Sequence, residues 1–169
     1  RLDASVKVNL LLKDGEHFPT GQSLLEIEGP ASVLASGERT ALNLSMHLSG
    51  IATKTASLVK EIQDTGIKLV DTRKTTPGLR LLEKYAVRCG GGINHRLGLD
   101  DAAMLKENHL AWTKDISTAI NSIRISAPWT TKVIVEAETT EQAKEAVLAG
   151  ADAILLDEFS PEELHRLVP

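Results

Sequence analysis

The sequence predicts an α/β protein in which a short β-rich segment precedes an α/β barrel. From residue 67 onward, short apolar runs alternate with amphipathic helical stretches, which is the pattern of a parallel sheet with crossover helices. Before residue 30 the chain shows β-type alternation between turn residues. No G-x-G-x-x-G motif follows a predicted strand, so a dinucleotide-binding doubly wound sheet is disfavoured and we expect an open, TIM-like barrel.

Composition narrows the class of protein. Of the 169 residues, 42% are hydrophobic and 25% charged, as in an ordinary globular domain. A net charge of −4 argues against nucleic-acid binding, and no apolar run approaches the roughly 20 residues of a membrane span. The single cysteine, Cys89, permits no internal disulfide and fits the cytoplasm. Since the chain starts at Arg1 without a leader and stops at Pro169, we expect it to be truncated at both ends.

Residues 1–35 are predicted to be the remainder of an N-terminal β-sandwich domain. Val6, Val8 and Leu10 share one strand face, and a second strand at 24–28 is closed by Gly29-Pro30. This pattern resembles half of a lipoyl or biotinyl carrier domain. Such a carrier needs an exposed lysine in the next hairpin, where this chain has Gly29-Pro30-Ala31, so a structural β-segment is the preferred interpretation.

Residues 36–169 are assigned to the barrel domain, incomplete at its C-terminal end. Its first helix is predicted from Ser36, because Ala41, Leu44, Leu48 and Ile51 share one helical face. Ser36 or Gly37 would cap this helix, which places Arg39 in the first turn. A cation is slightly unfavourable there, so Arg39 either serves another purpose or is a solvated surface arginine.

The remaining elements alternate along the barrel domain. Capping boxes at Thr139 and Ser160 mark two of the helix starts, and Gly150 marks a helix end. The expected strands are Ile67–Asp71, Ala102–Lys106, Lys132–Glu136 and Ala153–Asp157. The expected helices are Thr76–Ala86, Asp115–Arg124, one from Thr139 to Ala149, and one from Ser160.

Polar side chains follow four of these strands, at the end where barrel active sites lie. They are Thr72, Arg73 and Lys74 after the first strand, Lys106 after the second, and Glu136 and Asp157 at the ends of the last two. The cations, together with His95 and Arg96, suit carboxylates or phosphates. The two carboxylates suit Mg²⁺ beside a phosphate-rich substrate. The site therefore favours an anionic organic acid on one side and a metal-bound phosphate on the other.

Several motifs together resemble the quinolinate phosphoribosyltransferase family. They are Asp71-Thr72-Arg73-Lys74-Thr75-Thr76-Pro77-Gly78, Glu83-Lys84-Tyr85, Gly90-Gly91-Gly92, Asn94-His95-Arg96, Lys106-Glu107-Asn108-His109 and Ile154-Leu155-Leu156-Asp157. Glu28-Gly29-Pro30-Ala31 and Glu38-Arg39-Thr40-Ala41-Leu42-Asn43 extend the resemblance over nearly the whole chain. The resemblance implies a β-rich N-terminal domain followed by an open α/β barrel.

The resemblance also implies a reaction and roles. Quinolinate and phosphoribosyl pyrophosphate would give nicotinate mononucleotide, pyrophosphate and CO₂ with Mg²⁺, at the entry to NAD synthesis. The residues that would bind quinolinate are Arg73, His95, Arg96 and Lys106, assisted by Thr72, with Arg39 supplied by the neighbouring subunit of a homodimer. Lys74 would contact phosphoribosyl pyrophosphate, and Glu136 and Asp157 the ribose and the Mg²⁺. Lys74, Lys106, Glu136 and Asp157 are the expected catalytic residues of this pentosyltransferase.

Two alternatives remain open at this stage. The first is a phosphoribosyltransferase for nicotinate or another pyridine acid, although Arg73, Arg96 and Lys106 exceed what one carboxylate requires. The second is a non-catalytic, carrier-like binding module, based on the lipoyl-like start of the chain.

Overall fold

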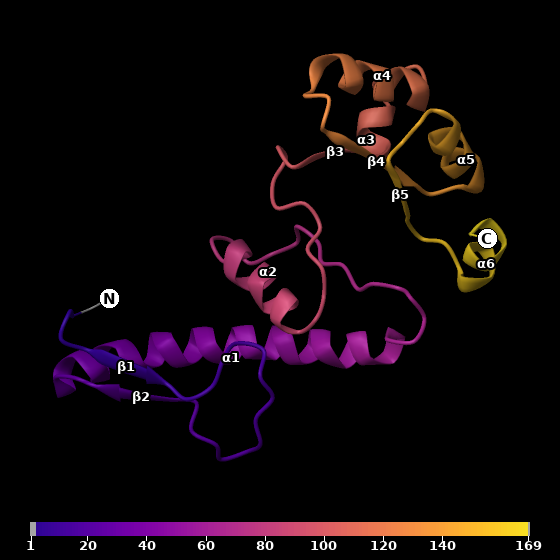
Figure 1. Ribbon diagram of the computed structural model, residues 1–169. Helices are drawn as coiled ribbons and strands as arrows, with labels where there is room; N and C mark the ends of the chain where they lie inside the picture. Colours follow the sequence, from indigo (N-terminus) through magenta and orange to yellow (C-terminus); the bar gives the residue numbers. More distant parts are fainter. Residues whose placement is uncertain (1–2, 169) are drawn as a thin grey trace. The chain divides into compact units, whose positions relative to one another are not determined.

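A computed structural model describes residues 3–168 and divides the chain into two compact units, which meet in sequence between Leu97 and Gly98 (Figure 1). Within residues 3–168, no helix combines the length and apolar character needed to cross a membrane.

The first unit begins with a two-stranded antiparallel sheet. Strand β1 (Lys7–Leu10) pairs with β2 (Leu25–Glu28), with Lys7 opposite Glu28 and Leu10 opposite Leu25. Both strands were predicted from their alternation, and both are confirmed.

A 32-residue helix, α1 (Ala31–Ile62), follows β2 directly (Figure 1). The predicted start at Ser36 is wrong, because the Pro30 carbonyl already accepts the N–H groups of Val33 and Leu34 at 3.0 Å. Ser36 lies within the helix, more than one turn after its start, and its Oγ donates to the Ser32 carbonyl at 2.7 Å. Arg39 therefore lies beyond the first turn, and the argument that the helix dipole disfavours a cation there does not apply.

The second helix, α2 (Arg80–Cys89), starts four residues later than predicted and extends beyond Ala86. Residues 76–79 form a turn instead, in which the Leu79 N–H donates to the Thr76 carbonyl at 3.0 Å. Gly78 has φ of +79°. Proline followed by a glycine with positive φ is the signature of a type II turn, and this turn delays the helix.

Three consecutive glycines follow α2 where it contacts α1. A Cβ on Gly90 would collide with the Ala52 carbonyl oxygen and lie 2.6 Å from the Thr55 Cβ, both on α1. Gly91 has φ of +84°, and a Cβ on Gly92 would lie 2.7 Å from Val87 Cγ1. The close packing of the two helices thus depends on these glycines.

The strand predicted at Ile67–Asp71 is wrong as a regular strand, since only Val70 forms a bridge, parallel to Ile93. The Ile93 N–H donates to the Leu69 carbonyl at 2.9 Å, and the Asp71 N–H to the Ile93 carbonyl at 3.1 Å. The next N–H, that of His95, donates to the Asp71 side chain at 2.8 Å. The carboxylate thus replaces the backbone acceptor and ends the ladder.

The second unit contains the predicted parallel sheet. Its strands β3 (Ala102–Leu105), β4 (Lys132–Ala137) and β5 (Ala153–Leu156) are all parallel, in the order β3-β4-β5. The helices are α3 (Glu107–Leu110), α4 (Ile116–Ser126), α5 (Thr140–Leu148) and α6 (Pro161–Leu167). The predicted strands and longer helices are confirmed, whereas the one-turn α3 was not anticipated.

Local signals explain why this unit was predicted well. Thr139 and Ser160 form the expected capping boxes with Gln142 and Glu163, and Asp115 caps α4 through the Thr118 N–H at 2.7 Å. The core between sheet and helices is fully buried and contains Val133, Val135, Ile120 and Ala146. This core fixes the sheet, and with it the residues at the carboxyl ends of its strands.

Candidate functional site

In the first unit, the Val70–Ile93 bridge sends two cationic segments out in the same direction. Thr72, Arg73 and Lys74 follow one side of the bridge, and His95 and Arg96 follow the other. Because the bridge is parallel, both segments leave at its carboxyl end. One backbone contact therefore gathers the predicted cations of residues 72–74 and 95–96.

Arg73 and Arg96 act on one another electrostatically. Burial, and then the positive charge of Arg73, lower the pKa of Arg96 from its usual value. The Arg73 Nε is buried and has no hydrogen-bond partner within residues 3–168. A buried, unsatisfied donor in a region of positive charge has the chemistry to bind an anionic oxygen.

The loop from Thr72 to Thr76 is fixed by its own hydrogen bonds. The Lys74 N–H donates to Thr72 Oγ1 at 3.1 Å, and the Thr75 N–H donates to the Arg73 carbonyl at 2.9 Å. The Thr76 N–H donates to Glu83 Oε2 at 3.0 Å. Thr72 and Lys74 are exposed, so both predicted ligand-binding side chains are accessible.

A buried polar cluster lies behind this loop. Lys84, only 2% exposed, donates from Nζ to Asp71 Oδ1 at 2.5 Å and to the His95 carbonyl at 3.1 Å. Asn94 Nδ2 donates to Asp71 Oδ2 at 2.7 Å and to the Lys84 carbonyl at 2.9 Å. Both oxygens of Asp71 are thus satisfied, and the cluster joins both cationic segments to α2.

The sequence interpretation assigned no role to this cluster. Charged residues on the buried face of an amphipathic helix were the available signal, because Glu83 and Lys84 are both buried on α2. Glu83 accepts the Thr76 N–H through Oε2, and its Oε1 lies 2.8 Å from His47 Nε2 on α1. These two hydrogen bonds of Glu83, to Thr76 and His47, lower its pKa.

Arg39 is exposed on α1 and is not among the residues gathered at the Val70–Ile93 bridge. Its predicted entry into the site of a neighbouring subunit remains a prediction.

In the second unit, the predicted residues lie at the carboxyl ends of the parallel strands. Lys106 follows β3, Glu136 lies at the end of β4, and Asp157 follows β5, donating its N–H to the Ala137 carbonyl at 3.0 Å. Lys106 Nζ lies 2.6 Å from Glu136 Oε2, with the lysine side chain 43% exposed and the glutamate 10%. This ion pair thus joins Lys106, which was predicted to bind the acid, to Glu136, which was predicted to bind the metal.

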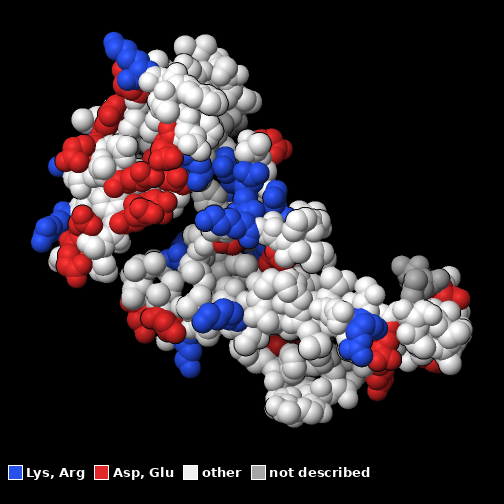
Figure 2. All heavy atoms as spheres, turned by 180° about the vertical axis from the view of Figure 1, so that it is seen from behind, with Lys and Arg blue, Asp and Glu red and all other residues white. Residues whose placement is uncertain are grey.

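Carboxylates gather around this ion pair. The pKa of Glu138 is raised by the negative charge of Glu107 and by burial, and further by Glu158, Asp157 and Glu136. Figure 2 shows Asp and Glu side chains lying side by side on one face of this unit. Among residues 3–168, no group of three or more His, Cys, Asp or Glu side chains is arranged to hold a metal ion. A Mg²⁺ ion held by one or two carboxylates, waters and substrate phosphate needs no such group.

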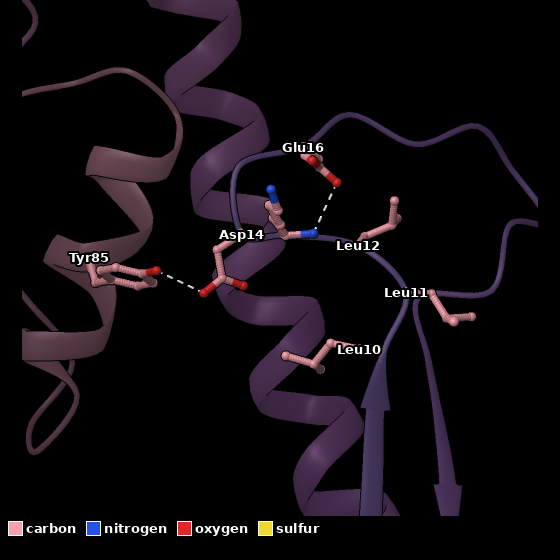
Figure 3. Close-up of a pocket in the computed structure, with 7 residues that line it drawn as sticks. Leu10, Leu11, Leu12, Asp14, Glu16 and Tyr85 are labelled. Atoms are coloured by element: carbon pink, nitrogen blue, oxygen red, sulfur yellow. Dashed lines mark hydrogen bonds between the residues drawn. The ribbon is translucent and has the colours of Figure 1, made fainter.

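A separate hollow of about 570 Å³ lies beside the N-terminal sheet of the first unit (Figure 3). Tyr85 on α2 donates from its hydroxyl to Asp14 Oδ2 at 2.8 Å. The bond to Asp14, followed by the proximity of Cys89, raises the pKa of Tyr85 to about 12. The hydrogen bond ties the loop after β1 to the helix that bears Glu83 and Lys84.

Comparisons with known proteins are consistent across the chain. The family described as "Quinolinate phosphoribosyl transferase, C-terminal domain" matches residues 51–169, and the corresponding N-terminal domain family matches residues 2–49. The chain is 50% identical over 165 residues to the probable nicotinate-nucleotide pyrophosphorylase [carboxylating] of Bacillus subtilis, covering 98% of this chain and 57% of that protein. It is 40% identical over 161 residues to the human nicotinate-nucleotide pyrophosphorylase [carboxylating], covering 94% of this chain and 54% of that protein.

Solved structures give the same similarity. NadC from Streptococcus pyogenes has 47% identity and a TM-score of 0.91, covering 99% of this chain and 59% of that chain. The nicotinate-nucleotide pyrophosphorylase from Francisella tularensis has 41% identity and a TM-score of 0.93, covering 99% of this chain and 59% of that chain. The present chain thus spans a little over half the length of these relatives.

Proposed function

The chain belongs to the quinolinate phosphoribosyltransferase family, and from this premise we propose that the complete protein makes nicotinate mononucleotide. Its substrates are quinolinate and phosphoribosyl pyrophosphate, and its other products are pyrophosphate and CO₂. The observation that supports this best is the pair Arg73 and Arg96 at one parallel bridge, with a buried Nε–H of Arg73 lacking an acceptor.

Quinolinate bears two carboxylates on adjacent ring carbons, and the cations of the first unit match that charge. Arg73 and Arg96 each offer a planar fork that binds a carboxylate in a bidentate manner, and a carboxylate oxygen satisfies the orphan Nε–H of Arg73. His95 and Thr72 assist. Lys106 keeps ammonium protons available for the acid because its side chain remains 43% exposed beside Glu136.

We assign phosphoribosyl pyrophosphate to a second set of residues. Lys74, exposed after Arg73, contacts its phosphates. Glu136 and Asp157 would hold Mg²⁺ and face the ribose. After Glu107, burial and Glu158, the charges of Asp157 and Glu136 also raise the pKa of Glu138, and a divalent ion would relieve this repulsion. When bound, Mg²⁺ neutralises charge on the pyrophosphate leaving group.

The chemistry proceeds by transfer of the ribosyl carbon. The bond from the anomeric carbon to pyrophosphate breaks with its electron pair leaving on pyrophosphate, and the pyridine nitrogen bonds to that carbon. The carboxylates of Glu136 and Asp157 stabilise positive charge developing on the ribose, while the cationic clamp keeps the nitrogen in line. When CO₂ leaves, the electron pair of the carbon–carboxylate bond stays on the ring carbon, where the adjacent positively charged nitrogen stabilises it, and a proton then bonds to that carbon.

The finer architecture belongs to this proposal. We assign residues 1–35 to the remainder of a β-sandwich domain and residues 36–169 to part of an open α/β barrel, to which the parallel sheet β3-β4-β5 would contribute three strands. The division falls inside α1, so it would not be a flexible linker. The complete protein forms a homodimer in which Arg39 enters the neighbouring subunit's site, and it works in the cytoplasm.

Titration calorimetry of the complete protein tests the proposal. Quinolinate should bind at least roughly tenfold more tightly than nicotinate, since nicotinate leaves part of the cationic clamp unpaired. The variant Arg73→Met should abolish this preference, whereas the matched change Arg166→Met on α6 should leave it intact. Equal or tighter binding of nicotinate would favour the pyridine-acid alternative. The carrier alternative has lost its basis, because α1 follows β2 where a carrier hairpin would stand.

A further inference from the structure

The buried cluster of Asp71, Lys84 and Asn94 has no role in the proposed chemistry, yet it is placed where both cationic segments begin. Asp71 directly precedes Thr72 and Arg73, and Asn94 directly precedes His95 and Arg96. The Asp71 carboxylate accepts the His95 N–H at 2.8 Å, in the position where the backbone ladder would otherwise continue. The geometry of one segment is therefore transmitted to the other through a side chain.

Two neighbouring guanidinium groups repel one another, so a backbone that holds them together needs an anchor. The lowered pKa of Arg96, partly caused by Arg73, reflects this repulsion. The two oxygens of the Asp71 carboxylate accept from Lys84 Nζ, Asn94 Nδ2 and the His95 N–H. Its effect on the arginines is therefore to fix the backbone on which they stand.

A buried ion pair is a weak source of stability, since an apolar pair of similar volume often serves as well. Lys84 and Asp71 are nevertheless only 2% and 9% exposed. Their role is then more readily understood as geometric, because the hydrogen bonds of the pair to Asn94 and to the His95 backbone hold these groups in one arrangement.

We propose that Asp71, Lys84 and Asn94 are positioning residues that fix Arg73 and Arg96 at the spacing of two adjacent carboxylates. The cluster thereby sets the preference for a dicarboxylate over a monocarboxylate. This inference rests on the proposed function, because it assigns the cluster to the acid-binding half of that site.

The test uses a charge-neutral double variant of the complete protein, Asp71→Asn with Lys84→Met. Removing both charges together avoids leaving an unpaired buried ion, and urea unfolding verifies that the variant is folded. Quinolinate affinity should fall roughly 10- to 100-fold, the loss expected when binding groups shift by about 1 Å. Nicotinate affinity should change by less than about threefold, because one arginine suffices for one carboxylate. The KM for phosphoribosyl pyrophosphate should stay unchanged.

Two further variants complete the design. Asn94→Ala leaves the ion pair intact but removes the two hydrogen bonds of Nδ2, and it should lower quinolinate affinity by roughly three- to tenfold. The control, Lys7→Met with Glu28→Gln, removes an exposed ion pair of the same unit at 3.4 Å and should change neither affinity. A folded double variant that still discriminates quinolinate from nicotinate as the parent does would overturn the proposal.

Amide hydrogen exchange separates this inference from the proposed function. If the unaltered protein shows no preference for quinolinate, the proposed function fails, while the exchange rates still report on the cluster. The amides of Arg73, His95 and Arg96 should exchange at least about tenfold faster in the double variant. Unchanged rates at these three amides would overturn the positioning role by themselves.

Discussion

Both units place cations and carboxylates beyond a parallel backbone pairing, but they hold them by different means. In the first unit one bridge, Val70 to Ile93, is followed by a buried side-chain cluster. In the second unit a three-stranded sheet over a closed apolar core carries the residues, and the Lys106–Glu136 ion pair is open to solvent on its lysine side. The contrast teaches that a site on a regular sheet is positioned by core packing, whereas a site on irregular backbone needs polar side chains to do the same.

Breaking the buried ion pair should have the largest effect on stability. Lys84→Met alone leaves the Asp71 carboxylate buried without its cation, and we expect a loss of about 3–5 kcal/mol in the free energy of unfolding. Urea denaturation of the complete protein measures this. The double variant with Asp71→Asn should recover part of the loss, and a single variant as stable as the parent would contradict the buried geometry of Lys84.

In the second unit the core should be the sensitive part. Ile120 on α4 is 1% exposed and belongs to the core packed against the sheet. Ile120→Ala should lower the free energy of unfolding by about 2–4 kcal/mol through lost burial and a residual cavity. Differential scanning calorimetry would show the loss as a lower Tm. The comparison variant Ile125→Ala, at a residue 87% exposed, should leave Tm nearly unchanged; equal losses at both positions would refute the assignment of this core.

The Lys106–Glu136 ion pair, which is open to solvent on its lysine side, should matter less for folding than the buried pair of the first unit. Lys106→Met should cost about 1–2 kcal/mol, less than Lys84→Met, although quinolinate binding should weaken strongly. Parallel measurement of urea unfolding and quinolinate affinity separates the two effects. A stability loss as large as that of Lys84→Met would remove the distinction between the units.

Tyr85 offers the smallest and most local probe. It is the only tyrosine of this chain, and its pKa is raised to about 12, because ionisation would place a phenolate beside the Asp14 carboxylate. Its contribution to stability is present below pH 10, the ordinary tyrosine value, and is lost as pH rises through 12. The difference in ultraviolet absorbance titration between the parent and Tyr85→Phe isolates this group.

In the variant Asp14→Asn, the midpoint of the Tyr85 titration should return toward 10. A midpoint already near 10 in the parent would mean that the loop after β1 does not rest on α2.

The sequence predicted the second unit closely and the first unit only in part, for a physical reason. Thr139 and Ser160 cap helices through hydrogen bonds to residues three positions later, so these helix starts can be predicted from a short stretch of sequence. Helix α1 begins after Pro30 without any side-chain cap, and the sequence analysis therefore placed its start wrongly at Ser36. The register of Val70 against Ile93 depends on residues 23 positions apart, and no local pattern encodes it.

The candidate site followed the same division. Arg73, Lys106 and Glu136 were predicted from their positions near strand ends, and Arg96 from its charge after the glycine run. In the structure the positive charge of Arg73 acts on Arg96, and Lys106 forms an ion pair with Glu136. The supporting cluster escaped prediction, because the partnership of Asp71 with Lys84 and Asn94 exists only after α2 packs against the bridge. Tertiary contacts, rather than residue type, give those side chains their role.

The glycine triplet after α2 has a consequence for anyone who would redesign this protein. Gly90 allows contact with α1, Gly91 supplies a left-handed backbone, and Gly92 makes room for Val87. Three different structural requirements thus apply to three adjacent residues, and alanine fails to meet each of them for a separate reason. A randomised library over positions 90–92 should return the parental sequence almost alone, and a chimaera with a cross-over point there should join only parents that both carry the triplet.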